Sequence, residues 1–517
     1  MSLLRAVATV GGFTMLSRIT GLMREMLIAH FMGAGMVADA FFVAFRFPNL
    51  FRSLFAEGAF NAAFIPLFTG KLTAEGKDAA QSFAQQAMAV MAVLLTVLVV
   101  LVELGMPWAI YGLAPGFDDV PGKIPLAIEL SRICFPYLLF ISLTSLQAGV
   151  LNSMGRFAAA AGTPILLNVV AMAGLWGLAP YTASPGHALA WGTFAAGISQ
   201  FAWLVFSVRK AGFALPLVRP RLTADVRLLL KRIVPGAVGA GVYQVNLVIN
   251  TMIASTVANG AVSYLNYADR VNQLPLGVVG IAIGTALLPL LSRQLKSGDH
   301  DGAIESQNRA MELALLTTLP AAAALLTLAA PIIQVLFERG HFGPQETAAT
   351  AQALMAFAIG LPAYVLVKVL TPGFFAREDT RTPVRIAIAT MALNVVLNLA
   401  LVSSLAHVGM ALSTAIAAWF NVVLLAWRLH GCGFFQLDRR LLNRAPRILA
   451  AAALMGAGLW YGRTLIWPQI NGFMAALAGL SLLVIAGLAL YGAAGLLFRA
   501  ARPSDLRSML RRRSTAQ

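Results

Sequence analysis

Charged side chains are scarce in this sequence. Asp, Glu, Lys and Arg together make up 11% of the 517 residues, whereas a soluble domain averages about 25%. Hydrophobic residues make up 59%, and the mean hydropathy is +0.78. This composition excludes an ordinary soluble globular protein and predicts a polytopic membrane protein.

Cysteines are few, and metal and nucleotide motifs are missing. Cys134 and Cys432 lie far apart in the sequence, and we expect two buried thiols with neither a disulfide nor a zinc site. The six histidines show no metal-ligand spacing, and the sequence contains no G-x-x-x-x-G-K-[ST] phosphate loop. No catalytic constellation is present either. We therefore expect a protein that is not an enzyme and needs no cofactor.

Long apolar segments predict an all-α fold with about fourteen transmembrane helices, because about 20 apolar residues in a helix span a bilayer. The expected spans are residues 7–32, 37–68, 82–112, 127–153, 159–181, 187–208, 233–257, 264–292, 309–337, 347–375, 384–404, 408–429, 447–466 and 473–498.

The formal net charge of +17 is concentrated in alternate short loops. Basic loops around Lys71, 209–232, 377–381 and 439–447 alternate with loops poor in net positive charge, such as 338–346. This alternation is typical of membrane topology and argues against nucleic-acid binding. The positive-inside rule places both termini in the cytoplasm.

Short words recur at a constant spacing and predict two related halves. Asn168 follows Pro136 by 32 residues, and Asn394 follows Pro362 by the same interval. A chance match of apolar words is the alternative. A parallel repeat predicts two six-helix lobes. The expected parts are a lobe at 1–211, a basic amphipathic cytoplasmic linker at 212–232, a lobe at 233–430, and two extra helices with a basic tail at 431–517.

The segment from residue 39 to residue 66 is apolar but holds five polar or charged residues. These are Asp39, Arg46, Asn49, Arg52 and Glu57. Each ionised group at the centre of a membrane helix costs roughly 2.5–3.5 kcal/mol, so these side chains cannot all face lipid. On a regular helix Asp39, Arg46 and Glu57 share a face. Two interpretations remain open: a polar substrate path, or an internal ion pair with a snorkelling helix end.

Other charged residues also lie in or near the expected spans. They are Arg18 and Arg24 in the first span, Asp269 and Arg270 in the eighth, and Lys368 in the tenth. With Arg46 and Arg52, five arginines from both halves oppose Asp39, Glu57 and Asp269. Because the planar guanidinium suits phosphate and carboxylate, the sequence favours an anionic substrate.

Asparagines form a weaker candidate site in the second half. Asn250 lies in the seventh span, and Asn394 and Asn398 share a face of the eleventh. Their amide oxygens are candidate cation ligands. Hydrogen bonding between helices is the favoured interpretation, so no metal site is assigned with these residues.

Five motifs together resemble one known family. They are MLSRITGLMRE, ADAFFVAFRFPNLFRSLFAEGAF, LAPGF, YADR and VKVLTPGFFAREDTRTPVRIA. These words, and the chain over nearly its whole length, resemble the MurJ (MviN) family of lipid II flippases in the multidrug/oligosaccharidyl-lipid/polysaccharide exporter superfamily. The resemblance implies two six-helix lobes in a V and two C-terminal helices that form a groove for a lipid tail.

The resemblance also implies residue roles. The family's essential charges correspond to Arg18, Arg24, Asp39, Arg52, Glu57, Asp269 and Arg270. Some relatives bind sodium at an aspartate-containing site on the seventh and eleventh helices, where this sequence has asparagines. Coupling to a membrane potential or to a monovalent cation therefore stays open.

The expected function is movement of undecaprenyl-pyrophosphate-linked peptidoglycan precursor from the inner to the outer leaflet of the bacterial cytoplasmic membrane, by alternating access. The five arginines and Asn49 would bind the head group, and Asp39, Glu57, Asp269 and Lys368 would act as ion-pair gates. The expected partners are lipid II and membrane lipids, with cell-wall synthesis enzymes as candidates, and we expect a monomer. The alternatives are a cation or drug antiporter of the same fold and a non-transporting scaffold for cell-wall enzymes.

Overall fold

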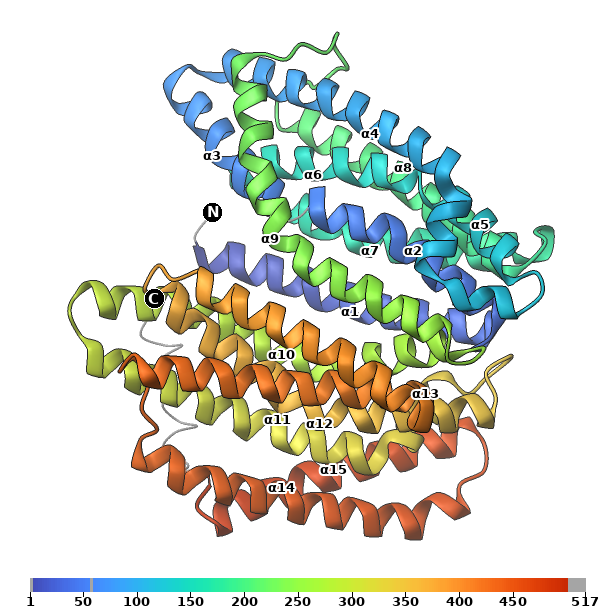
Figure 1. Ribbon diagram of the computed structural model, residues 1–517, viewed down its shortest axis with the longest axis vertical. Helices are drawn as coiled ribbons and strands as arrows, with labels where there is room; N and C mark the ends of the chain where they lie inside the picture. The colour runs from blue at the N-terminus through green and yellow to red at the C-terminus, as the bar shows by residue number, and fades with distance from the viewer. Residues whose placement is uncertain (1–2, 56–58, 501–517) are drawn as a thin grey trace. The chain divides into compact units, whose positions relative to one another are not determined.

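The computed structural model describes residues 3–55 and 59–500, and within these ranges the chain forms helices joined by turns and loops (Figure 1). Glu57, one of the expected gating residues, lies outside the described residues. The chain divides into two compact units: Met1–Ser263 with Arg339–Phe342, and Tyr264–Glu338 with Gly343–Gln517.

The first unit contains nine α-helices in its described part. They are α1 (Leu3–Met32), α2 (Met36–Phe55), α3 (Ala59–Ala74), α4 (Lys77–Leu113), α5 (Lys123–Cys134), α6 (Tyr137–Ser153), α7 (Phe157–Leu178), α8 (Pro185–Lys210) and α9 (Ala224–Ser255). Two short 3₁₀ turns, η1 (Pro115–Asp119) and η2 (Ala179–Tyr181), lie between them.

Aromatic residues at helical spacing build the core of the first unit. Phe60, Phe64 and Phe68 recur every four residues along α3 and therefore lie on one face. The Phe60 and Phe64 ring centroids are 5.2 Å apart, and Phe64 stacks at 5.6 Å on both Phe68 and Phe83 of α4. All four side chains are buried, so this stack fixes α3 against α4.

Helix α9 extends further toward the N-terminus than expected, beginning at Ala224 where the sequence predicted 233. Thr223 caps it, because its side chain accepts a hydrogen bond from the Val226 backbone N–H. Val226, Leu229 and Ile233 lie on one face and are buried in the core of the first unit. Burial of this face stabilises helical turns inside the segment predicted as a linker.

The boundary between the compact units also differs from the predicted lobe boundary. The units divide at Ser263, so that α9 packs within the first unit. The repeat predicted a second lobe that begins at residue 233. The predicted lobes are parts that would move as units during transport. Compact packing does not test such movement, so the lobes stay a prediction.

The second unit contains α10 (Ala261–Lys296, beyond its first turn), α11 (His300–Phe337), α12 (Pro344–Phe375), α13 (Arg381–Gly431), α14 (Arg439–Ile466), η3 (Trp467–Gln469) and α15 (Phe473–Leu497). Helix α13 bends at Ala406, whose φ of 48° and ψ of −133° are not helical. This bend separates the two expected spans 384–404 and 408–429.

Helices α14 and α15 pack together and against α11 (Figure 1). Leu328 of α11, Met455 and Leu459 of α14, and Leu483 of α15 form a buried cluster. The two helices outside the repeat are therefore an integral part of the second unit.

Nine helices among the described residues are long and apolar enough to span a membrane. They make the chain a multi-pass membrane protein, while the total of fourteen spans stays a prediction. One expectation about cysteine was wrong. Cys134 is buried, but Cys432 is exposed, because it follows the last turn of α13 where the chain leaves the helix; both are free thiols.

Candidate functional site

Asp39 is fully buried and occupies the first turn of α2. Its carboxylate accepts hydrogen bonds from Lys123 Nζ at 2.7 Å, Gly260 N at 2.7 Å, Ser263 N at 2.8 Å and Ser263 Oγ at 2.6 Å. An ionised carboxylate offers about four acceptor positions, so these four donors fill it. This Asp39 clasp (Asp39, Lys123, Gly260 and Ser263) ties α2 to α5 and to the turn that starts α10.

Lys123 supplies the charge that balances Asp39, and sequence reasoning missed it by placing it in a loop. It is the first residue of α5 and is only 1% exposed. Its ammonium also donates to Asn259 Oδ1 at 2.8 Å and lies 4.1 Å from the centroid of the Phe117 ring. One lysine close to Asp118 and Asp119 in the sequence shows no helical spacing that would predict burial. Only the fold shows that Lys123 is buried.

Asp39 and Arg46 share a helix but have different partners. Arg46 Nη1 donates to Thr251 Oγ1 of α9 at 3.0 Å, within the first unit. Helical spacing predicted that Asp39 and Arg46 share a face of α2. They nevertheless do not form one local cluster, because their partners differ. Asp39 anchors one end of α2, whereas Arg46 connects α2 to α9.

Arg24 has an acidic partner that sequence reasoning also missed. Arg24 Nη2 lies 2.9 Å from Glu25 Oε1, and Glu25 is 1% exposed. The Arg24 guanidinium is 5.6 Å from the centroid of the Phe45 ring of α2, a favourable cation–π distance. Neighbouring residues usually point away from each other on a helix, which is why the sequence gave no reason to pair them.

Arg52 and Asn49, both predicted cavity residues, contact each other. Arg52 Nε donates to Asn49 Oδ1 at 2.8 Å across one turn of α2. Arg18 lies half-buried on α1. Buried Asn168 of α7 donates to Ser17 O and to Thr20 Oγ1, both at 3.1 Å. Helix α7 thus holds the turn of α1 that carries Arg18.

The predicted charged residues of the second half lie on α10 and α12 of the second unit. Asp269 Oδ2 accepts a hydrogen bond from Gln273 Nε2 at 2.5 Å, one turn along α10. Arg270 and Lys368 are half-buried. These positions fit intramembrane charges that face protein, as the cost of charge in lipid requires.

The asparagine candidates are placed as a hydrogen-bonded pair. Asn394 and Asn398 are buried on α13, and Asn398 Nδ2 lies 3.4 Å from Asn394 Oδ1. Asn250 lies half-buried on α9 of the other unit. Among the described residues, no group of three or more His, Cys, Asp or Glu side chains could hold a metal ion. A role of these amides in ion coupling stays a prediction.

The arrangement in the first unit suits binding of an anion. Arg18 and Arg24 on α1, and Arg46 and Arg52 on α2, are partly buried at positions set by neighbouring side chains. Guanidinium groups held away from bulk water bind phosphate and carboxylate more strongly than exposed ones. The described residues therefore offer positioned cations for recognition.

Comparison with known proteins gives full-length matches. A family model described as lipid II flippase MurJ matches residues 28–478. A probable lipid II flippase MurJ of Rhizobium meliloti (strain 1021) is 45% identical over 523 residues, covering 100% of this chain and 98% of its own. The lipid II flippase MurJ of Burkholderia cenocepacia is 37% identical over 476 residues, covering 91% of each chain.

Solved structures share the fold. A lipid II flippase MurJ in an inward closed conformation matches with a TM-score of 0.79 and 24% identity, covering 95% of this chain and 98% of that one. A multidrug resistance MATE family transporter of the MOP superfamily, in an inward-facing conformation, matches with a TM-score of 0.67 and 14% identity, covering 81% and 95%. At these identities the structural likeness establishes the fold alone.

Proposed function

The chain belongs to the lipid II flippase MurJ family, and from this premise we propose that it moves lipid II from the inner to the outer leaflet of the bacterial cytoplasmic membrane. It is a multi-pass transporter of that membrane. The substrate combines a pyrophosphate-sugar head group with a long undecaprenyl tail. Its head must cross the hydrocarbon in a polar environment, while its tail can stay in lipid.

The four arginines of α1 and α2 are the observation that supports this proposal most directly. Pyrophosphate is a dense anion, and the planar guanidinium fork matches its oxygens in pairs. Arg18, Arg24, Arg46 and Arg52 bind the head group, and Asn49 orients Arg52. Arg270, on α10, is a fifth residue to which we assign substrate binding.

The Asp39 clasp acts as a gate in an alternating-access cycle. It replaces water around a buried ion pair with four hydrogen bonds, so it is stable only while closed to solvent. Once water enters, hydration of Asp39 and Lys123 compensates for the lost contacts. Asp39, Asp269, Lys368 and Glu57 then exchange partners between the two end states.

The energy source belongs to the same proposal. Moving one elementary charge across the membrane is worth roughly 2.3 kcal/mol per 100 mV, so the excess of cationic side chains allows the membrane potential to return the empty transporter. Coupling to a monovalent cation at the asparagine pair is the competing route. Both termini face the cytoplasm, and the protein works as a monomer, with cell-wall synthesis enzymes as candidate partners.

A leaflet-accessibility assay tests this function. Cells depleted of the protein should accumulate lipid II that an external lipid II-cleaving toxin cannot reach, and re-expression should restore cleavage. Unchanged accessibility during depletion would show that the protein does not move lipid II. An antiporter of the same fold would leave accessibility unchanged and alter drug efflux, and a scaffold would be inactive in purified proteoliposomes.

A further inference from the structure

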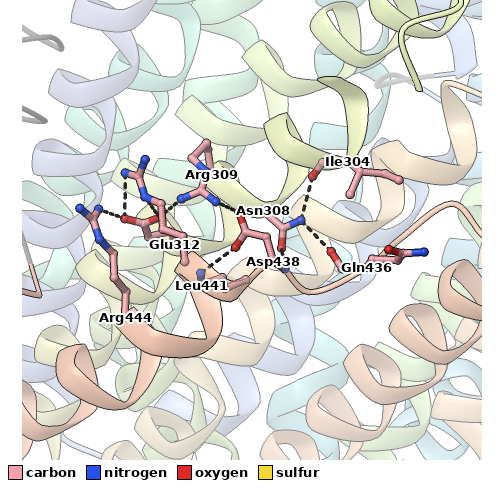
Figure 2. A network of polar contacts seen from close by, with 9 residues as sticks. Ile304, Asn308, Arg309, Glu312, Gln436, Asp438, Leu441 and Arg444 are labelled. Carbon is pink, nitrogen blue, oxygen red and sulfur yellow. Dashed lines mark hydrogen bonds and ion pairs between the residues drawn. The ribbon is translucent and has the colours of Figure 1, made fainter. Parts of the chain in front are cut away.

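A network of charged side chains joins the start of α14 to α11 in the second unit (Figure 2). Glu312 of α11 forms ion pairs with Arg309, Arg440 and Arg444, and its Oε2 lies 3.2 Å from Arg440 Nε. Glu312 and Arg444 are each only 7% exposed. A carboxylate buried among three guanidinium groups is a costly arrangement, which is stable only while every partner stays in place.

The residues just before α14 are tied to the same stretch of α11. Asp438, the N-cap of α14, accepts a hydrogen bond from Leu441 N at 2.6 Å and forms an ion pair with Arg309. Asn308 Nδ2 donates to Gln436 O at 2.8 Å (Figure 2). Both the cap of α14 and the chain that leads into it are therefore fixed on α11.

The sequence of α14 explains why it needs this support. Its first turn contains Arg439 and Arg440 and no acidic residue. Cations near a helix N-terminus oppose the helix dipole, and anions stabilise it. Asp438 at the N-cap supplies one negative charge, and Glu312 of α11 adds a second one beside Arg440. The contacts with α11 therefore add to the stability that the Asp438 cap gives to the start of α14.

Further contacts continue along both helices of the pair. Arg463 Nη1 of α14 donates to Thr327 O of α11 at 2.8 Å, and Trp467 Nε1 donates to Gln334 Oε1 at 3.0 Å. From α15, the Tyr491 hydroxyl donates to Leu316 O at 2.7 Å. The polar contacts thus extend along α11 from Asn308 to Gln334, as a fixed attachment requires.

We propose that Glu312 is a positioning residue that locks the α14–α15 pair onto α11, and that the pair stays locked throughout the transport cycle. The proposal rests on the proposed function, in which the lipid tail stays in the lipid phase while the head group crosses. A fixed pair keeps an apolar surface in register with α11 while other parts of the protein move.

A disulfide between α11 and α14 tests whether the pair moves. A Cβ at Gly456 would lie 3.5 Å from the Ala323 Cβ, within the Cβ separation of about 3.5–4.5 Å found in disulfides. Ala323→Cys with Gly456→Cys, in a Cys432→Ser background, should cross-link on oxidation. In proteoliposomes the cross-linked protein should flip lipid II as fast as the reduced protein. Flipping that stops on oxidation and returns on reduction would overturn the proposal.

Glu312→Gln tests the residue itself. Removing one partner of a buried ion network leaves the remaining charges unpaired, so flipping should fall about tenfold and the 323–456 cross-link should form less completely. Glu312→Asp keeps the negative charge, so this variant should retain both the flipping rate and the cross-linking yield. Asp301→Asn is the matched control, because Asp301 is an exposed carboxylate on the same helix. It should change neither measurement.

Rescue separates positioning from any other role of Glu312. Oxidising the cysteine pair in the Glu312→Gln protein should restore flipping, since the disulfide replaces the lost attachment. A cross-linked Glu312→Gln protein that stays inactive would overturn the positioning role. If Glu312→Gln does not accumulate, the disulfide in the otherwise unaltered protein still decides whether the pair moves. Cross-linking is measured without substrate. A failure of the positioning proposal can therefore be told apart from a failure of the proposed lipid II flippase function.

Discussion

At the scale of single residues, partners far apart in the sequence decide what each charge does. Lys123 and Asp39 are 84 positions apart, and their side chains are 2% and 0% exposed. Taking both charges out of water is costly, and their mutual attraction repays that cost only when hydrogen bonds satisfy the remaining atoms. Gly260, Ser263 and Asn259 provide those bonds. The pair therefore holds α2, α5 and the start of α10 in place.

Lys123→Met should leave the Asp39 carboxylate buried without its counter-charge. Loss of one member of a buried ion pair typically costs about 3–5 kcal/mol, so the melting temperature of the detergent-purified protein should fall by several degrees. Lys296→Met is the control, because Lys296 is exposed at the end of α10. Equal melting temperatures for the two variants would show that the Asp39 clasp contributes little to stability.

The arginines allow a sharper test, in which charge is separated from geometry. Proteins with Arg24→Ala or Arg52→Ala should fail to support growth of cells depleted of the unaltered protein. Both variants should remain abundant in the membrane. Arg24→Lys and Arg52→Lys should be partly active, because lysine keeps the charge but loses the paired guanidinium donors.

Arg221→Ala serves as the control for these variants, since Arg221 is exposed in the segment before α9. It should support normal growth. Normal growth of the Arg24→Ala and Arg52→Ala strains would show that these arginines do not bind the head group.

At the scale of helices, small residues decide which faces can meet. Helix α15 carries four glycines, Gly479, Gly487, Gly492 and Gly495, where a neighbouring helix could approach closely. Gly479 and Gly487 are buried against other side chains, and a Cβ at Gly487 would lie 3.0 Å from Leu459 Cδ2 of α14. A Cβ at Gly492 would meet nothing within 4 Å. Close packing therefore occurs at Gly487 on the face toward α14, and an added Cβ would meet no neighbour at Gly492 or Gly495.

Gly487→Leu and Gly492→Leu form a matched pair on α15. Leucine at 487 should push α15 away from Leu459, because a packed interface tolerates added methylenes poorly, and lipid II flipping should fall severalfold. Leucine at 492 has open space and should leave flipping unchanged. The two variants are compared by their lipid II flipping rates in proteoliposomes, normalised to the amount of protein. Equal rates would show that α15 needs no close contact with α14.

At the scale of the whole molecule, the loop charges predict which side of the membrane each loop faces. Cysteines introduced singly at Asp118 or Gln345, both exposed, should react with an impermeant thiol reagent from outside intact cells. Cysteines at exposed Arg221 or Arg381 should react only after permeabilisation. Because the native Cys432 is itself exposed, the Cys432→Ser background is needed. The reverse labelling pattern would invert the predicted topology.

The sequence by itself determined the membrane class, the helical fold and the family. These depend on local properties: an apolar run long enough to span lipid must satisfy its backbone internally and so forms a helix, and the motifs of α1, α2 and α12 are contiguous words. It also located the polar segment 39–66 and the arginines on α1, because a charge within an apolar run is visible without any partner.

Only the tertiary structure decided which charges meet. Nothing in the sequence singled out Lys123 or Glu312, and Glu25 was only the last residue of a motif, yet each is buried against a partner. Arg444 reaches Glu312 across 132 positions, a separation over which helical periodicity carries no information. Composition predicts that a charge in a membrane helix must be compensated. The packing of the helices determines which side chain compensates it.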